Sequence, residues 1–230
     1  MRGARGFTLV ELVISLAIIG LLLGMLMVPL NAQVDQRRTS DTQRELQLIS
    51  EALMGFAVAN GRLPCPAVPT TANTAVGAGL ENKPGTDCAG VASGAAEGVI
   101  PWATLGVPET DAWGRRFTYR VTAEFANDPP VGGMQSTFTL TDNGNATVTN
   151  GAANIATSIA AVMVSHGKNG AGAYLSDGTR MALGVGDEGE NSDADNTFVS
   201  RTNAPDFDDL VGWISPNVVK SRMVAGNRLP

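Results

Sequence analysis

The sequence predicts an α+β fold, in which one long N-terminal helix packs on an antiparallel β-sheet. The prediction depends on the order of two patterns. Apolar residues recur at helical spacing between residues 46 and 56, and four strand-like segments separated by turns follow between 115 and 166. Residues 31–45, polar on nearly every face, join the apolar stripe to an apolar N-terminal run and are typical of a helix surrounded by solvent.

The N-terminal run, residues 7–30, is long enough to cross a membrane. Glu11 is its only ionisable side chain, and as a helix the run would measure about 36 Å at 1.5 Å per residue. Arg2 and Arg5 precede it, so the positive-inside rule places the N-terminus in the cytoplasm and everything after Leu30 across the membrane. We therefore expect a single-pass inner-membrane protein with a periplasmic C-terminal domain.

Glu11 is the unusual residue of this run. A secretory signal peptide cleaved after Ala32 and a plain signal anchor are the alternatives to a retained helix with a function of its own. The run is longer than the usual 7–15 residues of a signal peptide and includes this carboxylate. At mid-bilayer a carboxylate costs roughly 2.5–3.5 kcal/mol, which predicts a partner of opposite charge.

The start of the run resembles the processing site of type IV pilins and of type II secretion pseudopilins. The resemblance depends on a basic leader that ends in glycine, followed by the residues Phe7, Thr8, Leu9 and Glu11. It implies cleavage between Gly6 and Phe7 by a prepilin peptidase, N-methylation of Phe7, and retention of the membrane helix. It also implies that Glu11 pairs with the Phe7 amine of a neighbouring subunit and so sets the register of assembly.

The helix is expected to continue beyond the membrane to Asn60. Its apolar stripe consists of Leu46, Ile49, Leu53 and Phe56, and Asn60-Gly61 with Pro64 is a stop signal. The predicted organisation is a leader at 1–6, a transmembrane and assembly helix at 7–30, its periplasmic continuation at 31–61, and a periplasmic β domain at 62–230.

Residues 67–100 have no clear period and predict a long loop. Cys65 and Cys88 bracket most of it. In an oxidising compartment a disulfide between them would stabilise the fold by about 3 kcal/mol on the loop-entropy model, and two buried free thiols are the alternative.

The strand-like segments are 115–122, 135–141, 145–149 and 158–166. The stretch TDNGN, from residue 141, predicts a hairpin between the second and the third. The fourth is almost continuously apolar and should lie in the centre of the sheet. Ser215 and Pro216 predict the start of a short helix that ends near Gly226.

Three later stretches resemble the major pseudopilin of type II secretion: NGRLP at 60–64, DAWGRRFTY at 111–119 and SHGKNG at 165–170. The chain departs from that family at Ala112, where proline is usual, and is much longer, which favours a minor pilin or a divergent pseudopilin. In that family the last loop holds calcium. The residues that could do so here are Asn169, Asp193, Asp195, Asp208 and Asp209, and a solvated acidic loop without metal is the alternative.

Composition and motifs argue against other classes of protein. A net charge of −6 argues against binding nucleic acid through bulk charge. His166 is the only histidine, and the adjacent Ser165 should face the other way on a strand, so no catalytic pair is predicted and we expect no enzyme.

The expected function is that of a structural subunit, a minor pilin or pseudopilin, of a type IV pilus or a type II secretion pseudopilus. Its expected partners are other subunits, the prepilin peptidase and methyltransferase, and an inner-membrane assembly platform. The alternative is a single-span anchored periplasmic binding module or enzyme that does not polymerise.

Overall fold

The computed structural model describes residues 6–90, 94–128 and 136–229, and the side chains of residues 23–32 lie outside this description. The chain separates into two compact units, Met1–Ser40 and Asp41–Pro230. Helix α1, Leu9–Asn60, begins in the first unit and ends in the second. Most of the leader predicted at 1–6 therefore falls outside the described residues.

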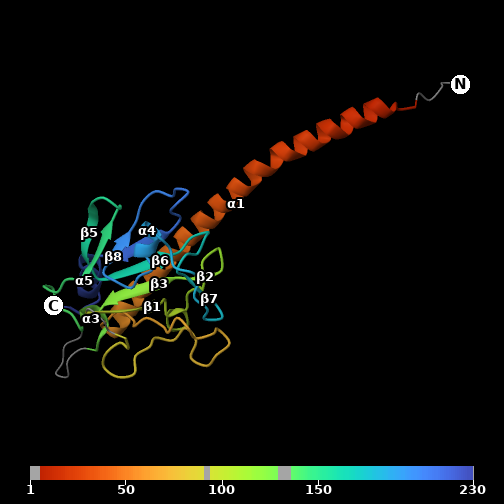
Figure 1. Ribbon diagram of the computed structural model, residues 1–230. Helices are drawn as coiled ribbons and strands as arrows, with labels where there is room; N and C mark the ends of the chain where they lie inside the picture. Colours follow the sequence, from red (N-terminus) through yellow and green to blue (C-terminus); the bar gives the residue numbers. More distant parts are fainter. Residues whose placement is uncertain (1–5, 91–93, 129–135, 230) are drawn as a thin grey trace. The chain divides into compact units, whose positions relative to one another are not determined.

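The second unit contains a four-stranded antiparallel sheet, which confirms the α+β class (Figure 1). Its strand order is β1-β3-β6-β9, formed by Ala95–Val99, Thr118–Thr122, Ala161–Ser165 and Leu210–Ile214. A three-stranded sheet has the order β5-β4-β8, formed by Asn154–Ile159, Ala146–Thr149 and Thr197–Val199; β4 and β8 run parallel. A third pair joins β2, Arg115–Arg116, to β7, Tyr174–Leu175.

The helices other than α1 are short. They are α2 at Trp102–Leu105, α3 at Ala123–Ala126, α4 at Asp187–Glu190 and α5 at Pro216–Ala225. Ser215 is the N-cap of α5, Pro216 its first residue and Gly226 its C-cap, which confirms the predicted C-terminal helix. Gly61, at a φ of 77°, follows the last residue of α1, as the stop signal predicted.

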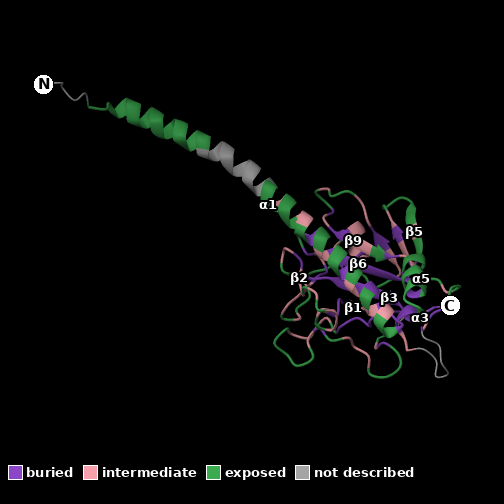
Figure 2. Cartoon of the chain, turned by 180° about the vertical axis from the view of Figure 1, so that it is seen from behind, coloured by how far each residue is buried: buried purple, intermediate pink, exposed green. Residues whose placement is uncertain are grey.

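The two faces of the four-stranded sheet differ because side chains alternate along each strand. Tyr119, Val121 and Met163 belong to the core that contains α1, and Figure 2 shows the buried positions of α1 over β6 and β3. Val162 and Val164 face the other way and pack against the three-stranded sheet. The second unit is thus layered as helix, sheet and smaller sheet.

The buried stripe of α1 differs from the prediction at one position. Leu46, Ile49 and Leu53 are buried as predicted, but Phe56 is half exposed, and Met54 and Ala57 are buried instead. The reason is the spacing of four between residues 49, 53 and 57, which keeps these three on one row. The ring of Phe56 instead lies beside Arg62, with 5.3 Å between the guanidinium carbon and the ring centroid.

The strand and hairpin predicted at 135–145 are wrong. Residues 136–141 form bends and turns, residue 135 lies outside the described residues, and β4 pairs with β5 and β8. Phe138 does not belong to a strand because its side chain is buried in the core. Its ring centroid lies 4.6 Å from that of Phe125. Gly144 is needed for a different reason from the one predicted: a Cβ there would lie 1.9 Å from the carbonyl oxygen of Ile159.

The predicted strands at 115–122 and 158–166 are each divided. The first becomes β2 and β3, separated by the buried Phe117. In the second, Ser158 has a φ of 57° and Ala160 lies between β5 and β6. β6 is central in the four-stranded sheet, as expected, while the residues before it belong to the smaller sheet.

The predicted loop at 67–100 ends in strand β1, which the sequence did not indicate. The rest of it is tied to the domain at two places. Cys65 and Cys88 form a disulfide with 5.3 Å between their Cα atoms. Arg62 makes a two-pronged contact with Glu81, in which Nη1 and Nη2 donate to the carboxylate at 2.8 and 2.9 Å.

The turn at residues 111–114 shows why Ala112 suits this chain. Asp111 Oδ1 accepts hydrogen bonds from the amides of Trp113 and Arg115, and Gly114 has a φ of 79°. The amide of Ala112 donates to Thr42 Oγ1 of α1 at 3.2 Å. Proline has no N–H group and could not make this bond.

Glu45 should make the stability of the second unit depend on pH. Burial, followed by the charges of Asp111 and Asp41, raises the pKa of Glu45 from 4.5 to about 7. The folded state therefore holds this proton more tightly than the unfolded state, and the free energy of unfolding falls as pH rises from 4.5 through 7. We expect Glu45→Gln to raise the melting temperature by a few degrees at pH 8 and to change little at pH 4. Glu51→Gln, at an exposed position of the same helix, is the control, and equal effects of both variants would contradict this account.

Candidate functional site

The residues predicted for processing and assembly lie at the start of α1. Gly6 and Phe7 precede the helix and are both exposed, so the bond between them is open to a peptidase. Glu11 lies in the first turn. After cleavage at this bond, Phe7 would be the first residue of the chain. It would lie two residues before the start of the helix at Leu9.

Thr8 and Glu11 form a capping box at this helix start. The Thr8 amide donates to Glu11 Oε2 at 2.9 Å, and the Thr8 hydroxyl donates to the same oxygen at 2.8 Å. In return, the Glu11 amide donates to Thr8 Oγ1 at 3.2 Å. The spacing Thr-x-x-Glu is the sequence signal from which this arrangement could have been predicted. Glu11 thus has a partner within its own chain.

The first turns of α1 expose apolar side chains on all sides. Between residues 9 and 22 the large apolar side chains are 51% to 79% exposed: Leu9, Val10, Leu12, Val13, Ile14, Leu16, Ile18, Ile19, Leu21 and Leu22. A contiguous apolar surface of this kind marks a site of contact with protein or lipid.

Within the part of the chain that the structure describes, no helix is long and apolar enough to cross a membrane. The span predicted at 7–30 runs into residues 23–32, whose side chains lie outside that part.

A second candidate site is a group of three acidic side chains near the C-terminus. Glu188 on α4 and Asp208 and Asp209 before β9 place carboxylate oxygens within 4.8 Å of one another. Glu188 and Asp209 are buried. The Asp208 amide donates to Glu188 Oε1 at 3.1 Å, and Asn191 Nδ2 donates to Asp209 Oδ2 at 2.8 Å.

The negative charges of these three carboxylates are only partly offset by hydrogen bonds. Asp208 Oδ1 and Asp209 Oδ1 are buried and accept no hydrogen bond from the described residues. Burial, reinforced by Glu188 and Asp208, raises the pKa of Asp209 to about 8 although Asn191 acts against it. Buried like charges with free oxygens require a proton or a cation, and carboxylate oxygens are the ligands that Ca²⁺ prefers. The donor set therefore fits a hard divalent cation.

This group overlaps only in part with the ligand set predicted from the sequence. Asp208 and Asp209 belong to it, and Glu188 was missed because it is close in space but twenty residues away in sequence. Asn169 contacts it through nitrogen: Nδ2 donates to Glu188 Oε1 at 2.8 Å, and Oδ1 accepts from the Ala171 amide. Asp193 and Asp195 lie outside the group, and Asp195 Oδ1 accepts from the Thr197 amide.

Ser165 and His166 do not form a nucleophile and base. Ser165 Oγ donates to Asp111 Oδ2 at 2.6 Å, and the His166 ring contacts Thr118 Oγ1 at 2.8 Å. Burial, with smaller contributions from Arg180 and Arg115, lowers the pKa of His166 to about 4. The ring is therefore neutral near pH 7.

Comparison with known proteins identifies the N-terminal segment. Residues 1–27 match the prokaryotic N-terminal methylation motif, which is the prepilin motif of type IV pilins and pseudopilins. No curated protein and no solved structure matches the chain. The motif implies processing by a prepilin peptidase and anchoring in the inner membrane, and the α+β architecture is consistent with the pilin fold.

Proposed function

We propose that this protein is a structural subunit, a minor pilin or pseudopilin, of a type IV pilus or a type II secretion pseudopilus. The observation that carries the proposal is the prepilin motif at residues 1–27, placed on a long helix whose first turns are apolar on all sides. In this proposal the chain is cut between Gly6 and Phe7, the Phe7 amine is methylated, and the helix then packs among those of other subunits on an inner-membrane assembly platform.

The role of Glu11 in this proposal is to pair with the Phe7 amine of a neighbouring subunit. Its carboxylate is already held at the helix start by Thr8, which fixes its position before a neighbour arrives. Blocking cleavage at Gly6 should therefore prevent assembly as completely as removing Glu11, because the amine would not exist.

Mass spectrometry of the mature N-terminus tests the proposal directly. We expect a chain that begins with a methylated Phe7. A chain that retains Met1, or that begins at Gln33 after signal-peptide cleavage, would instead support the alternative: an anchored or secreted periplasmic module that does not polymerise. Filament-bound protein and the membrane pool should be analysed separately, since processing precedes assembly.

We also propose that Glu188, Asp208 and Asp209 hold Ca²⁺. The unsatisfied oxygens of Asp208 and Asp209 support this assignment, and the bound cation would neutralise three carboxylates and join α4 to the segment before β9. A solvated acidic loop is less well supported because Glu188 and Asp209 are buried.

Removal of Ca²⁺ by EGTA should lower the melting temperature of the full-length chain, and added Ca²⁺ should restore it. A ligand at 100 times its dissociation constant stabilises by about 2.7 kcal/mol. Asp209→Asn should abolish the response. The matched control is Asp193→Asn, an exposed residue outside the group, which should keep it. An unchanged melting temperature after chelation of the wild-type chain would remove the site.

A further inference from the structure

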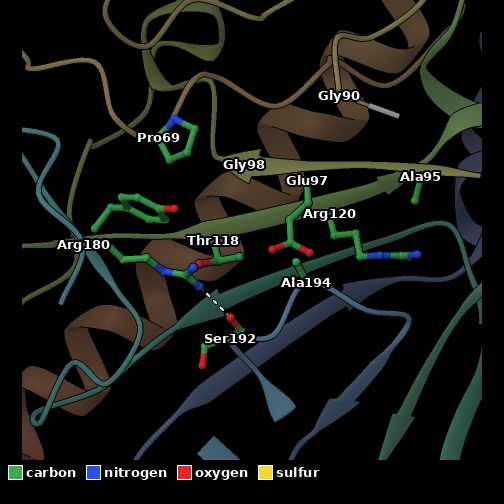
Figure 3. A pocket seen from close by; sticks show the side chains of 11 residues that line it. Pro69, Gly90, Ala95, Glu97, Gly98, Thr118, Arg120, Arg180, Ser192 and Ala194 are labelled. Atoms are coloured by element: carbon green, nitrogen blue, oxygen red, sulfur yellow. Dashed lines mark hydrogen bonds between the residues drawn. The ribbon is translucent and has the colours of Figure 1, made fainter. Parts of the chain in front are cut away.

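A cavity of about 270 Å³ lies on the face of the four-stranded sheet that is turned away from α1. Its walls include Glu97 of β1, Thr118 and Arg120 of β3, Tyr174 of β7, and Arg180 (Figure 3). Small residues on its border, such as Gly98 and Ala194, leave the space open. This volume is near the lower end of the range for small-molecule sites, roughly 300–1,000 Å³, so it suits a small ligand.

The face of β3 that borders this cavity is polar although it is covered. Thr118, Arg120 and Thr122 are buried. Each is engaged by polar groups: Thr118 contacts His166, Arg120 donates to Asn145 and Asn196, and Thr122 donates to Asn145. A sheet face covered only for packing would normally carry apolar residues, as the opposite face does.

Glu97 and Arg120 are opposite each other in the β1–β3 register, but the side-chain hydrogen bonds of Arg120 go to Asn145 and Asn196. Figure 3 shows the Arg120 head turned away from the Glu97 carboxylate. Oε2 of Glu97 is buried and accepts no hydrogen bond within the described part of the chain. Burial raises the pKa of Glu97 to about 7, with Arg120 and Arg180 acting against it and Asp193 and Asp195 reinforcing it.

Arg180 supplies the opposite charge in the same cavity. Its Nε donates to the Gly172 carbonyl at 3.2 Å and its Nη2 to the Ser192 carbonyl at 2.5 Å, so both partners are uncharged. Arg180 is exposed, and its guanidinium carbon lies 5.2 Å from the centroid of the Tyr174 ring. An acid and a guanidinium therefore border one cavity, and neither is neutralised by a hydrogen-bonded counter-charge in the described structure.

We propose that this cavity binds a small zwitterion of the free amino acid type, with its ammonium group on Glu97 and its carboxylate on Arg180. The ammonium group would supply the hydrogen bonds that Glu97 Oε2 lacks, and the carboxylate would accept from the Arg180 guanidinium. The site is separate from the three-carboxylate group and from the helix start. Its occupation does not depend on polymerisation, so it stands or falls independently of the proposed function.

The test is a thermal-shift and calorimetric titration of the full-length chain with each standard L-amino acid. Methylammonium and acetate, which carry one charged group each, are the reference compounds. We expect at least one amino acid to raise the melting temperature and neither reference compound to do so. No shift with any amino acid, or an equal shift with methylammonium or acetate alone, would overturn the proposal.

Variants locate the binding. Glu97→Gln should weaken binding at least tenfold while leaving the melting temperature of the unliganded chain unchanged or higher, because a buried charge without a partner is removed. Arg180→Lys keeps the charge but alters the donor geometry, and it should also weaken binding. Glu124→Gln, on the exposed side of α3, is the matched control and should bind like the wild type. Undiminished binding by Glu97→Gln would overturn the assignment.

Discussion

Glu11→Gln is expected to abolish assembly while the chain is still processed. Glutamine keeps the capping box, because its side-chain oxygen can still accept from the Thr8 amide, but it has no negative charge for a neighbour's Phe7 amine. Removing one partner of a buried ion pair costs about 3–5 kcal/mol, which is more than a hundredfold in the equilibrium constant for adding each subunit. The measurements are the yield of sheared filaments or cross-linked multimers, and the N-terminal mass of the membrane pool.

Thr8→Val is the matched control because it removes the hydroxyl of the capping box and keeps the charge of Glu11. Losing an N-cap side chain costs about 1 kcal/mol of helix stability. This variant should therefore assemble, at a reduced yield. If Glu11→Gln assembled normally and Thr8→Val did not, Glu11 would act as a helix cap alone, and the proposed pairing between subunits would be wrong.

Arg116→Ala is expected to lower the free energy of unfolding by about 3–5 kcal/mol, as when one partner of a buried ion pair is removed. Arg116 is fully buried. Its guanidinium contacts Glu109 at 2.9 Å, donates to the carbonyls of Pro69, Thr71 and Ser176, and lies 4.6 Å from the Trp102 ring centroid. For a unit of this size the melting temperature should fall by roughly 6–20 °C.

Two variants define the origin of this effect. Arg116→Lys keeps the charge but cannot reach the same carbonyls with a planar fork, so it should lose part of the stability. Arg222→Ala removes an exposed arginine, 3.9 Å from Glu51, and should change the free energy of unfolding by less than about 1 kcal/mol. Similar losses for Arg222→Ala and Arg116→Ala would show that the buried contacts of Arg116 do not account for this stability.

The parts of the fold that were predictable are those decided by local patterns. The end of α1, strands β3 and β6, and helix α5 follow from hydrophobic periodicity and from the chemistry of Gly61, Ser215 and Pro216. The segment at 136–141 was predicted as a strand because polar and apolar residues alternate along it. In the structure Phe138 is buried in the core although the segment forms no strand. β1 was missed because its pairing with β3 joins residues that are 19 to 27 positions apart in the sequence.

The candidate sites also divide into those that a local sequence pattern predicts and those that only the fold brings together. Gly6, Phe7 and Glu11 form a contiguous motif, and even the capping box could have been predicted from Thr8 and Glu11. The acidic group could not, since only the fold brings Glu188 to Asp208 and Asp209 and separates Asp193 and Asp195 from them. The cavity at Glu97 depends on β1, which the sequence did not indicate.

The division of residues 158–166 between two sheets has a consequence for how the second unit unfolds. Ile159 belongs to β5 and the smaller sheet, Ala161 to β6 and the larger one, and only Ala160 separates them. Because the connection between β5 and β6 is a single residue, separation of either strand from its sheet would displace the other strand as well. We therefore expect the two sheets to melt in one cooperative transition instead of opening as independent subdomains.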